Sequence, residues 1–313
     1  MKGILRMEPE PAMEPEPAAE VLREISQALV ISCVRQQELA EEAATARRQC
    51  QEASAALEAA LARERHITEI LQRPLTLAIP EHAFPGLSVA TLYEAALQEA
   101  QVGGDFFDAF ALPRGRVALV IADASGKGLQ AAARAIQVKE VLRAFAREYP
   151  HSPARVLSRL NDYVCDTKQF EEQPEEGFVT LTLAILDPVT GEASVVNAGA
   201  ELPLLLRKDG QAEAVDIGGL PLGVERGGLY PVTPWRLAPG DTLLLVTDGV
   251  TEARRGRGQS GEFLGFEGLE RLAKGAASAP SLQAMAAQVV EGARAFRAGA
   301  FADDVCLLLA RRL

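Results

Sequence analysis

The pattern of hydrophobic and polar positions divides the chain into three parts. Residues 8–18 repeat Glu and Pro, a composition that cannot bury a core, and they predict a disordered leader over 1–18. Residues 19–72 contain neither proline nor glycine and are rich in strong helix formers. Arg73 and Pro74 end this stretch, because the helical backbone conformation is disfavoured for a residue that precedes a proline. We therefore expect a helix over 19–73 and a globular domain over 74–313.

A heptad repeat runs through the helical stretch. Two series of mostly apolar positions recur every seven residues; the first is Leu22, Leu29, Gln36, Ala43, Cys50, Leu57, Glu64 and Leu71, and the second includes Ile25, Leu39 and Ile67. A helix of about fifty residues is roughly 75 Å long and cannot bury such a stripe by itself. The pattern favours a homodimeric coiled coil, with a helix packed back on its own domain as the alternative. It leaves parallel and antiparallel pairing open.

Short apolar runs separated by turn residues dominate the remaining chain. Strands are predicted at 75–79, 87–93, 117–121, 178–186, 193–198, 202–206, 229–237, 242–247 and 305–310, and helices at 129–149, 153–167, 265–274 and 281–294. Residues 169–177 are polar and predict a surface loop. Because most strands follow one another without intervening helices, the pattern indicates an antiparallel α+β domain.

Composition narrows the function. The 313-residue chain has 32 Lys and Arg against 43 Asp and Glu, a net charge of −11, which disfavours nucleic acid and anionic membranes as partners. Its longest apolar runs are far shorter than a membrane span, and no secretory leader opens the chain, so we expect a cytoplasmic protein. Four cysteines without CxxC spacing and three scattered histidines make a disulfide framework or zinc site improbable. A metal here would be held by oxygen.

Four acidic points fall at the ends of predicted strands. Asp105 and Asp123 lie at the two ends of a hairpin within 101–128, where an antiparallel pair brings opposed residues to roughly 5 Å. Asp248 follows the apolar strand that ends at Thr247, and Asp303 precedes the last strand. Each could be an ordinary turn or capping residue. Gathered in one place, the carboxylates would require a hard cation such as Mg²⁺ or Mn²⁺.

Eight sequence blocks carry a resemblance to a known family. They are VGGDFFD, IADASGKG, FVTLTLAILD, NAGAELPLLL, GLPLGV, GDTLLLVTDGVTEAR, LGFEGL and DDVCLLL, and they occur in the family's order from about residue 75 to the C-terminus. The chain resembles the SpoIIE-like branch of the PPM (type 2C-like) metal-dependent serine/threonine protein phosphatases. The resemblance implies an α-β-β-α sandwich of two antiparallel sheets flanked by helices.

The resemblance also implies a site with two divalent ions, Mn²⁺ or Mg²⁺, that activate a water for attack on phosphorus. Its ligands would be Asp105, Asp123, the backbone carbonyl of Ala124, Asp248 and Asp303. Lys127 would contact the substrate phosphate, and Asp304 would orient its neighbour.

The chain departs from the family pattern at four positions near these blocks. Ala200 replaces the usual His, Ala122 the usual Gly, Phe107 the usual Tyr and Cys306 the usual Thr. None of the four is a predicted ligand, so we expect an active enzyme. The effect of Ala200 on its loop stays open.

In such phosphatases the substrate is typically a phosphorylated STAS-domain anti-sigma-factor antagonist in a bacterial partner-switching pathway. The resemblance therefore implies this substrate, with control through the N-terminal helix by an upstream sensor or activator protein. Three alternatives remain. They are a non-catalytic phosphoprotein-binding scaffold with the same fold, a two-metal phosphoesterase acting on a small molecule, and a purely structural coiled coil.

Overall fold

The structure is a computed structural model that describes residues 17–95, 103–169, 177–214, 217–255, 261–297, 301 and 303–313. Most of the predicted leader and most of the polar loop at 169–177 lie outside the described residues. The chain forms two compact units, 1–63 and 64–313. No described helix is both long and apolar enough to cross a membrane.

One helix, α1 (Pro17–Leu75), runs from the first unit into the second. Its first residue is a proline. Proline is favoured at the first position of a helix, because a backbone N–H at that position would have no intrahelical partner and proline lacks this N–H. The apolar seam residues Leu22, Leu29 and Leu57 are exposed in the single chain, at 68%, 60% and 61%. The long helix is confirmed, while its pairing as a coiled coil stays a prediction.

The second unit contains two five-stranded antiparallel sheets. The first has the order β2-β3-β4-β5-β8, with β2 (Asp105–Ala111), β3 (Val117–Ala124), β4 (Val179–Leu186), β5 (Glu192–Ala198) and β8 (Thr233–Arg236). The second has the order β1-β12-β9-β6-β7, with β1 (Leu87–Glu94), β12 (Val305–Arg312), β9 (Thr242–Val246), β6 (Leu204–Leu206) and β7 (Ala212–Ala214). A small ribbon pairs β10 (Arg254–Arg255) with β11 (Glu262–Phe263).

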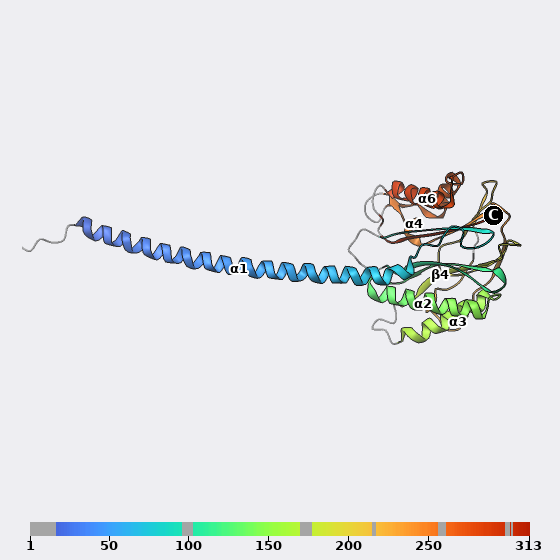
Figure 1. Cartoon of the computed structure of the whole chain (residues 1–313), viewed down its shortest axis with the longest axis horizontal. Helices are drawn as coiled ribbons and strands as arrows, with labels where there is room; N and C mark the ends of the chain where they lie inside the picture. The colour runs from blue at the N-terminus through green and yellow to red at the C-terminus, as the bar shows by residue number, and fades with distance from the viewer. Residues whose placement is uncertain are drawn as a thin grey trace, which may run out of the picture. The chain divides into compact units, whose positions relative to one another are not determined.

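Helices cover the outer face of each sheet. In Figure 1, α2 (Leu129–Glu148) and α3 (Pro153–Lys168) lie on one side of the strands, and α4 (Asp248–Thr251) and α6 (Leu282–Arg297) lie on the other, where α5 (Gly265–Gly275) also packs. Strand alternation sorts the side chains: Phe106 packs with α2 and α3, whereas Phe107 faces the other sheet. The predicted α-β-β-α sandwich is confirmed.

Two strand predictions were wrong. No strand forms at 75–79, because Leu75 is the last residue of α1 and its carbonyl accepts a hydrogen bond from the buried Lys139 of α2. The predicted strand at 229–237 is reduced to β8, an edge strand that contains Pro234. Proline donates no backbone hydrogen bond and is tolerated only at an edge.

Candidate active site

The β2–β3 hairpin places the first two predicted acids opposite each other. Asp105 pairs in register with Asp123, at the end of the hairpin away from its turn. Asp105 is buried, and its Oδ2 accepts a 2.7 Å hydrogen bond from the Thr247 hydroxyl. Burial, and then the charge of Asp123, raises the pKa of Asp105 well above its ordinary value. The surroundings of Asp105 and Asp123 therefore do not stabilise both carboxylates in their charged form.

Thr247 ties the two sheets together at this point. It directly follows β9, and its hydroxyl oxygen accepts a 3.0 Å hydrogen bond from the backbone N–H of Cys306 in β12. The same hydroxyl donates to Asp105 in the other sheet. A site at this end is therefore built from both sheets.

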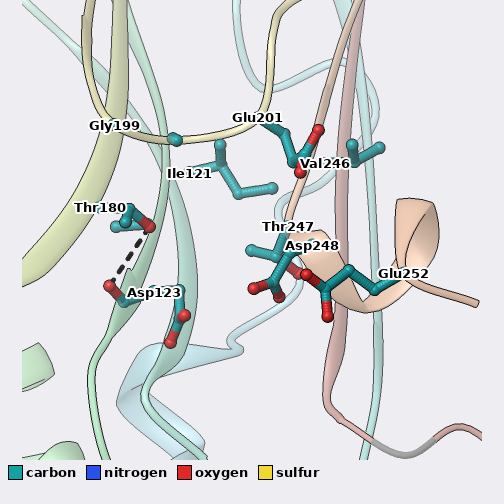
Figure 2. Close-up of a pocket in the computed structure, with 11 residues that line it drawn as sticks. Ile121, Asp123, Thr180, Gly199, Glu201, Val246, Thr247, Asp248 and Glu252 are labelled. Carbon is teal, nitrogen blue, oxygen red and sulfur yellow. Dashed lines mark hydrogen bonds between the residues drawn. The ribbon is translucent and has the colours of Figure 1, made fainter. Parts of the chain in front are cut away.

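Asp248 comes next in the chain and begins α4. It lines a cavity of about 120 Å³ together with Asp123, Thr180, Glu201 and Glu252. Figure 2 shows Asp123 and Thr180 on one wall and Asp248 and Glu252 on the other. Burial, followed by the charges of Asp123 and Glu252, raises the pKa of Asp248 to about 7.

The last two predicted acids have different surroundings. Asp303 is exposed, and its carboxylate lies 3.7 Å from the Lys127 ammonium. Asp304 is buried, and its Oδ2 accepts a 2.7 Å hydrogen bond from the Tyr93 hydroxyl. The charge of Asp303 contributes to the raised pKa values of Asp123 and Asp248, but Asp303 is not among the residues that line the cavity.

Three glycines make close approaches around these acids. A Cβ on Gly103 would stand 1.5 Å from Asp304 Oδ2, and one on Gly249 would stand 1.9 Å from the Asp304 carbonyl oxygen. A Cβ on Gly104 would stand 2.0 Å from the Ala124 carbonyl oxygen. Only glycine fits at these positions, because any Cβ would overlap those atoms. The glycines thus fix the backbone that carries the predicted ligands.

The donor set fits hard divalent cations. It consists of carboxylates and one predicted carbonyl, and burial is the first cause that raises the pKa values of Asp105, Asp123 and Asp248. Within the described ranges, no three His, Cys, Asp or Glu side chains already surround a single point closely enough to hold an ion. Asp123 and Asp248 line the cavity, whereas Asp105 and Asp303 are not part of its lining.

Several residues of the site were not singled out by their sequence pattern as members of it. Thr180, Glu201 and Glu252 line the cavity, Thr247 donates a hydrogen bond to Asp105, and Tyr93 donates one to Asp304. Thr247 directly precedes Asp248, so its position next to a predicted ligand could have pointed to it. Tyr93 lies 211 residues from Asp304, and no local pattern connects the two.

Comparisons with known proteins agree with this fold. Residues 113–313 match the family described as Stage II sporulation protein E (SpoIIE). The chain is 27% identical over 209 residues to Protein IcfG of Synechocystis, covering 59% of this chain and 32% of that protein. It is 27% identical over 214 residues to phosphoserine phosphatase RsbU of Bacillus subtilis, covering 68% of this chain and 60% of that protein.

The chain is also similar to a solved structure. The RsbU and RsbW domains of a Mycobacterium tuberculosis protein superpose with a TM-score of 0.64 at 30% identity, covering 76% of this chain and 62% of that one. The chain thus spans less than two thirds of the length of each of these three relatives.

Proposed function

The chain belongs to the SpoIIE family, a branch of the metal-dependent PPM phosphatases, and from this we propose that it hydrolyses phosphoserine or phosphothreonine on a protein. One observation carries the proposal. Acids from distant stretches of the chain come together where the two sheets meet: Asp123 and Asp248 line one cavity, and Asp105 pairs in register with Asp123. The raised pKa values of these three carboxylates favour bound cations, and phosphate hydrolysis uses such cations.

We assign the metal ligands as the sequence predicts them: Asp105, Asp123, the Ala124 carbonyl, Asp248 and Asp303. When bound there, two Mn²⁺ or Mg²⁺ ions would activate water and neutralise phosphate charge. The Thr247 hydroxyl orients Asp105, and the Tyr93 hydroxyl together with Gly103 fixes Asp304 beside Asp303. Lys127 stands next to Asp303, where its ammonium can meet a phosphate oxygen.

The substrate is proposed to be a phosphorylated STAS-domain anti-sigma-factor antagonist in a partner-switching pathway. The family membership and the similarity to phosphoserine phosphatase RsbU support this choice. The unpaired seam of α1 supports a homodimer, and it offers an upstream sensor or activator a surface to bind.

Control through α1 is supported by contacts of its last turn. The Gln72 side-chain amide donates to the Tyr93 hydroxyl, which in turn donates to Asp304. The buried Lys139 ammonium donates to the carbonyl of Pro74 at 2.7 Å and to that of Phe107 in β2 at 3.0 Å. A shift of this turn would therefore change the positions of Asp304 and of β2, the strand that carries Asp105.

The test is manganese-dependent phosphate release from a serine-phosphorylated STAS-domain protein. Asp248→Asn is expected to lower kcat/KM at least about 100-fold, because it removes a ligand charge. Asp209→Asn makes the same change at an exposed turn and serves as the matched control. Equal rates for wild type and Asp248→Asn would refute the mechanism.

Two further outcomes separate the alternatives. Activity on p-nitrophenyl phosphate without activity on the phosphoprotein would favour a small-molecule phosphoesterase. Tight binding of the phosphoprotein without phosphate release would favour a non-catalytic scaffold.

A further inference from the structure

The loop between β7 and β8 is held against α3 by polar contacts. Asn161 of α3 is fully buried; its amide donates to the Glu225 carbonyl at 2.8 Å and accepts from the Gly223 N–H at 2.9 Å. The Ser158 hydroxyl donates to the Gly228 carbonyl at 3.1 Å. These contacts, spread over six residues of the loop, hold its backbone in one position.

The same loop packs against one wall of the cavity. Leu222 and Val179 of β4 exchange two backbone hydrogen bonds, of 2.8 and 3.0 Å, next to Thr180, which lines the cavity. A Cβ on Gly199 would stand 2.7 Å from Pro221 Cγ, and Gly199 itself lines the cavity. Figure 2 shows Gly199 above Thr180. The loop therefore supports this wall from outside, although none of its described residues lines the cavity.

Three exposed apolar side chains belong to this loop or directly precede the strand that it pairs with, and we call them the apolar rim. They are Phe178, Leu220 and Val224, exposed by 37%, 51% and 51%. Leu220 lies between Gly219 and Pro221, and Phe178 is bonded through its backbone to Ser125, two residues after Asp123. Fixed apolar groups beside a cavity are a recurring feature of interaction sites.

The cavity is too small for more than a phosphorylated side chain. At about 120 Å³ it cannot take up a folded protein, so the remainder of a protein substrate must lie over the edge. The bound cations and Lys127 of the proposed site would hold the phosphate itself, whereas the cavity lining, with Glu201 and Glu252, and the net charge of −11 do not attract the rest of an acidic partner. Apolar contact is the interaction that the exposed side chains beside the cavity wall offer to the rest of the substrate.

We propose that the apolar rim docks an apolar surface of the protein substrate next to its phosphorylated residue. This inference rests on the proposed phosphatase function and adds to it a site for substrate selection outside the catalytic cavity. It assigns Leu220 and Val224 a role in binding protein substrates alone. A small phosphate ester occupies the cavity without reaching them.

The experiment uses the full chain with the double variant Leu220→Ser/Val224→Ser. Val189→Ser is the matched control: Val189 is 83% exposed and follows the far end of β4, some 25 Å from the cavity at about 3.3 Å per residue. Each protein is assayed on p-nitrophenyl phosphate and on a serine-phosphorylated STAS-domain protein. Thermal midpoints and molar masses from light scattering are recorded for all three.

The double variant is expected to keep wild-type kcat and KM for p-nitrophenyl phosphate. For the phosphoprotein its kcat/KM should fall roughly 10- to 100-fold, mainly through a higher KM, because docking no longer buries the two side chains. Val189→Ser should match wild type on both substrates.

Three results would overturn the proposal. An unchanged kcat/KM for the phosphoprotein would show that the rim does not contact it. A parallel loss on both substrates would show a structural effect on the cavity. A changed molar mass would show that the rim contacts a second copy of the chain. Failure of wild type to release phosphate from either substrate would instead refute the proposed function itself.

Discussion

At the scale of single residues, the electrostatics of Asp248 dominate the cavity. Its pKa is raised from 3.8 to about 7, first by burial and then by the charges of Asp123, Glu252, Asp303 and Glu201. Between these two pH values the folded protein binds more protons than the unfolded chain. Its free energy of unfolding must then decrease as the pH rises through this window. A bound divalent ion removes the penalty by compensating the carboxylate charge.

This gives a prediction for the metal-free protein. In EDTA, the thermal midpoint should fall between about pH 5 and pH 7.5, and Asp248→Asn should weaken that fall because residue 248 no longer titrates. Added Mn²⁺ should raise the midpoint more at pH 7.5 than at pH 5, since metal competes with protons. Calorimetric scans across this range check both statements. A stabilisation by Mn²⁺ that is equal at the two pH values would contradict the ligand role of the carboxylates.

Which acids lie close together was in part predictable at this scale. Strand alternation and the hairpin turn set the pairing of Asp105 with Asp123, and both are local. The burial of Asp304, with Asp303 left exposed, was not predictable, because it depends on Tyr93 and Gly103 from distant segments. The ligand assignments themselves stay predictions.

At the scale of elements, the last turn of α1 contacts β1 through Gln72 and α2 through Pro74. Local pattern predicted the helix but placed its end two residues early and began a strand at Leu75. The reason is long-range: Lys139, 64 residues away, holds the Leu75 carbonyl, and Leu75 itself is buried in the core beneath α2. Sequence periodicity carries no information about such a partner.

The contact from Gln72 through Tyr93 to Asp304 can be tested as a unit. Tyr93→Phe removes the hydroxyl that holds Asp304 and should raise the Mn²⁺ concentration for half-maximal activity about 10-fold or more. Gln72→Ala should raise it less. The double variant should match Tyr93→Phe, because Gln72 acts through Tyr93. Additive effects would contradict the coupling, and Gln137→Ala on the exposed face of α2 is the control.

At the scale of the whole molecule, the two compact units differ in what they can bury. Unit 64–313 has three clusters of buried apolar residues, whereas the described side chains of α1 before residue 64 are exposed. A seam of that kind is stabilised by a second helix. Periodicity repeated over many residues predicted the seam and the antiparallel strands, whereas the α-β-β-α sandwich was implied by the resemblance to a known family.

Removal of residues 1–63 is expected to convert a dimer into a monomer, because it deletes most of the seam. Light scattering measures the change in mass. Phosphate release by the shortened protein should also lose its response to anything that binds α1. An unchanged mass and an unchanged rate would together refute both dimerisation and control through the helix.

The hydroxyl of Thr247 forms hydrogen bonds with both sheets at the candidate site. Asp105 and Asp123 belong to one sheet, whereas Asp248 and Asp303 follow or precede strands of the other. Metal–oxygen distances of about 2.1 Å tolerate little error. If one sheet slid past the other by about an ångström, the proposed metal site would be disrupted although the strand pairing within each sheet stayed intact. Loss of activity therefore need not involve unfolding.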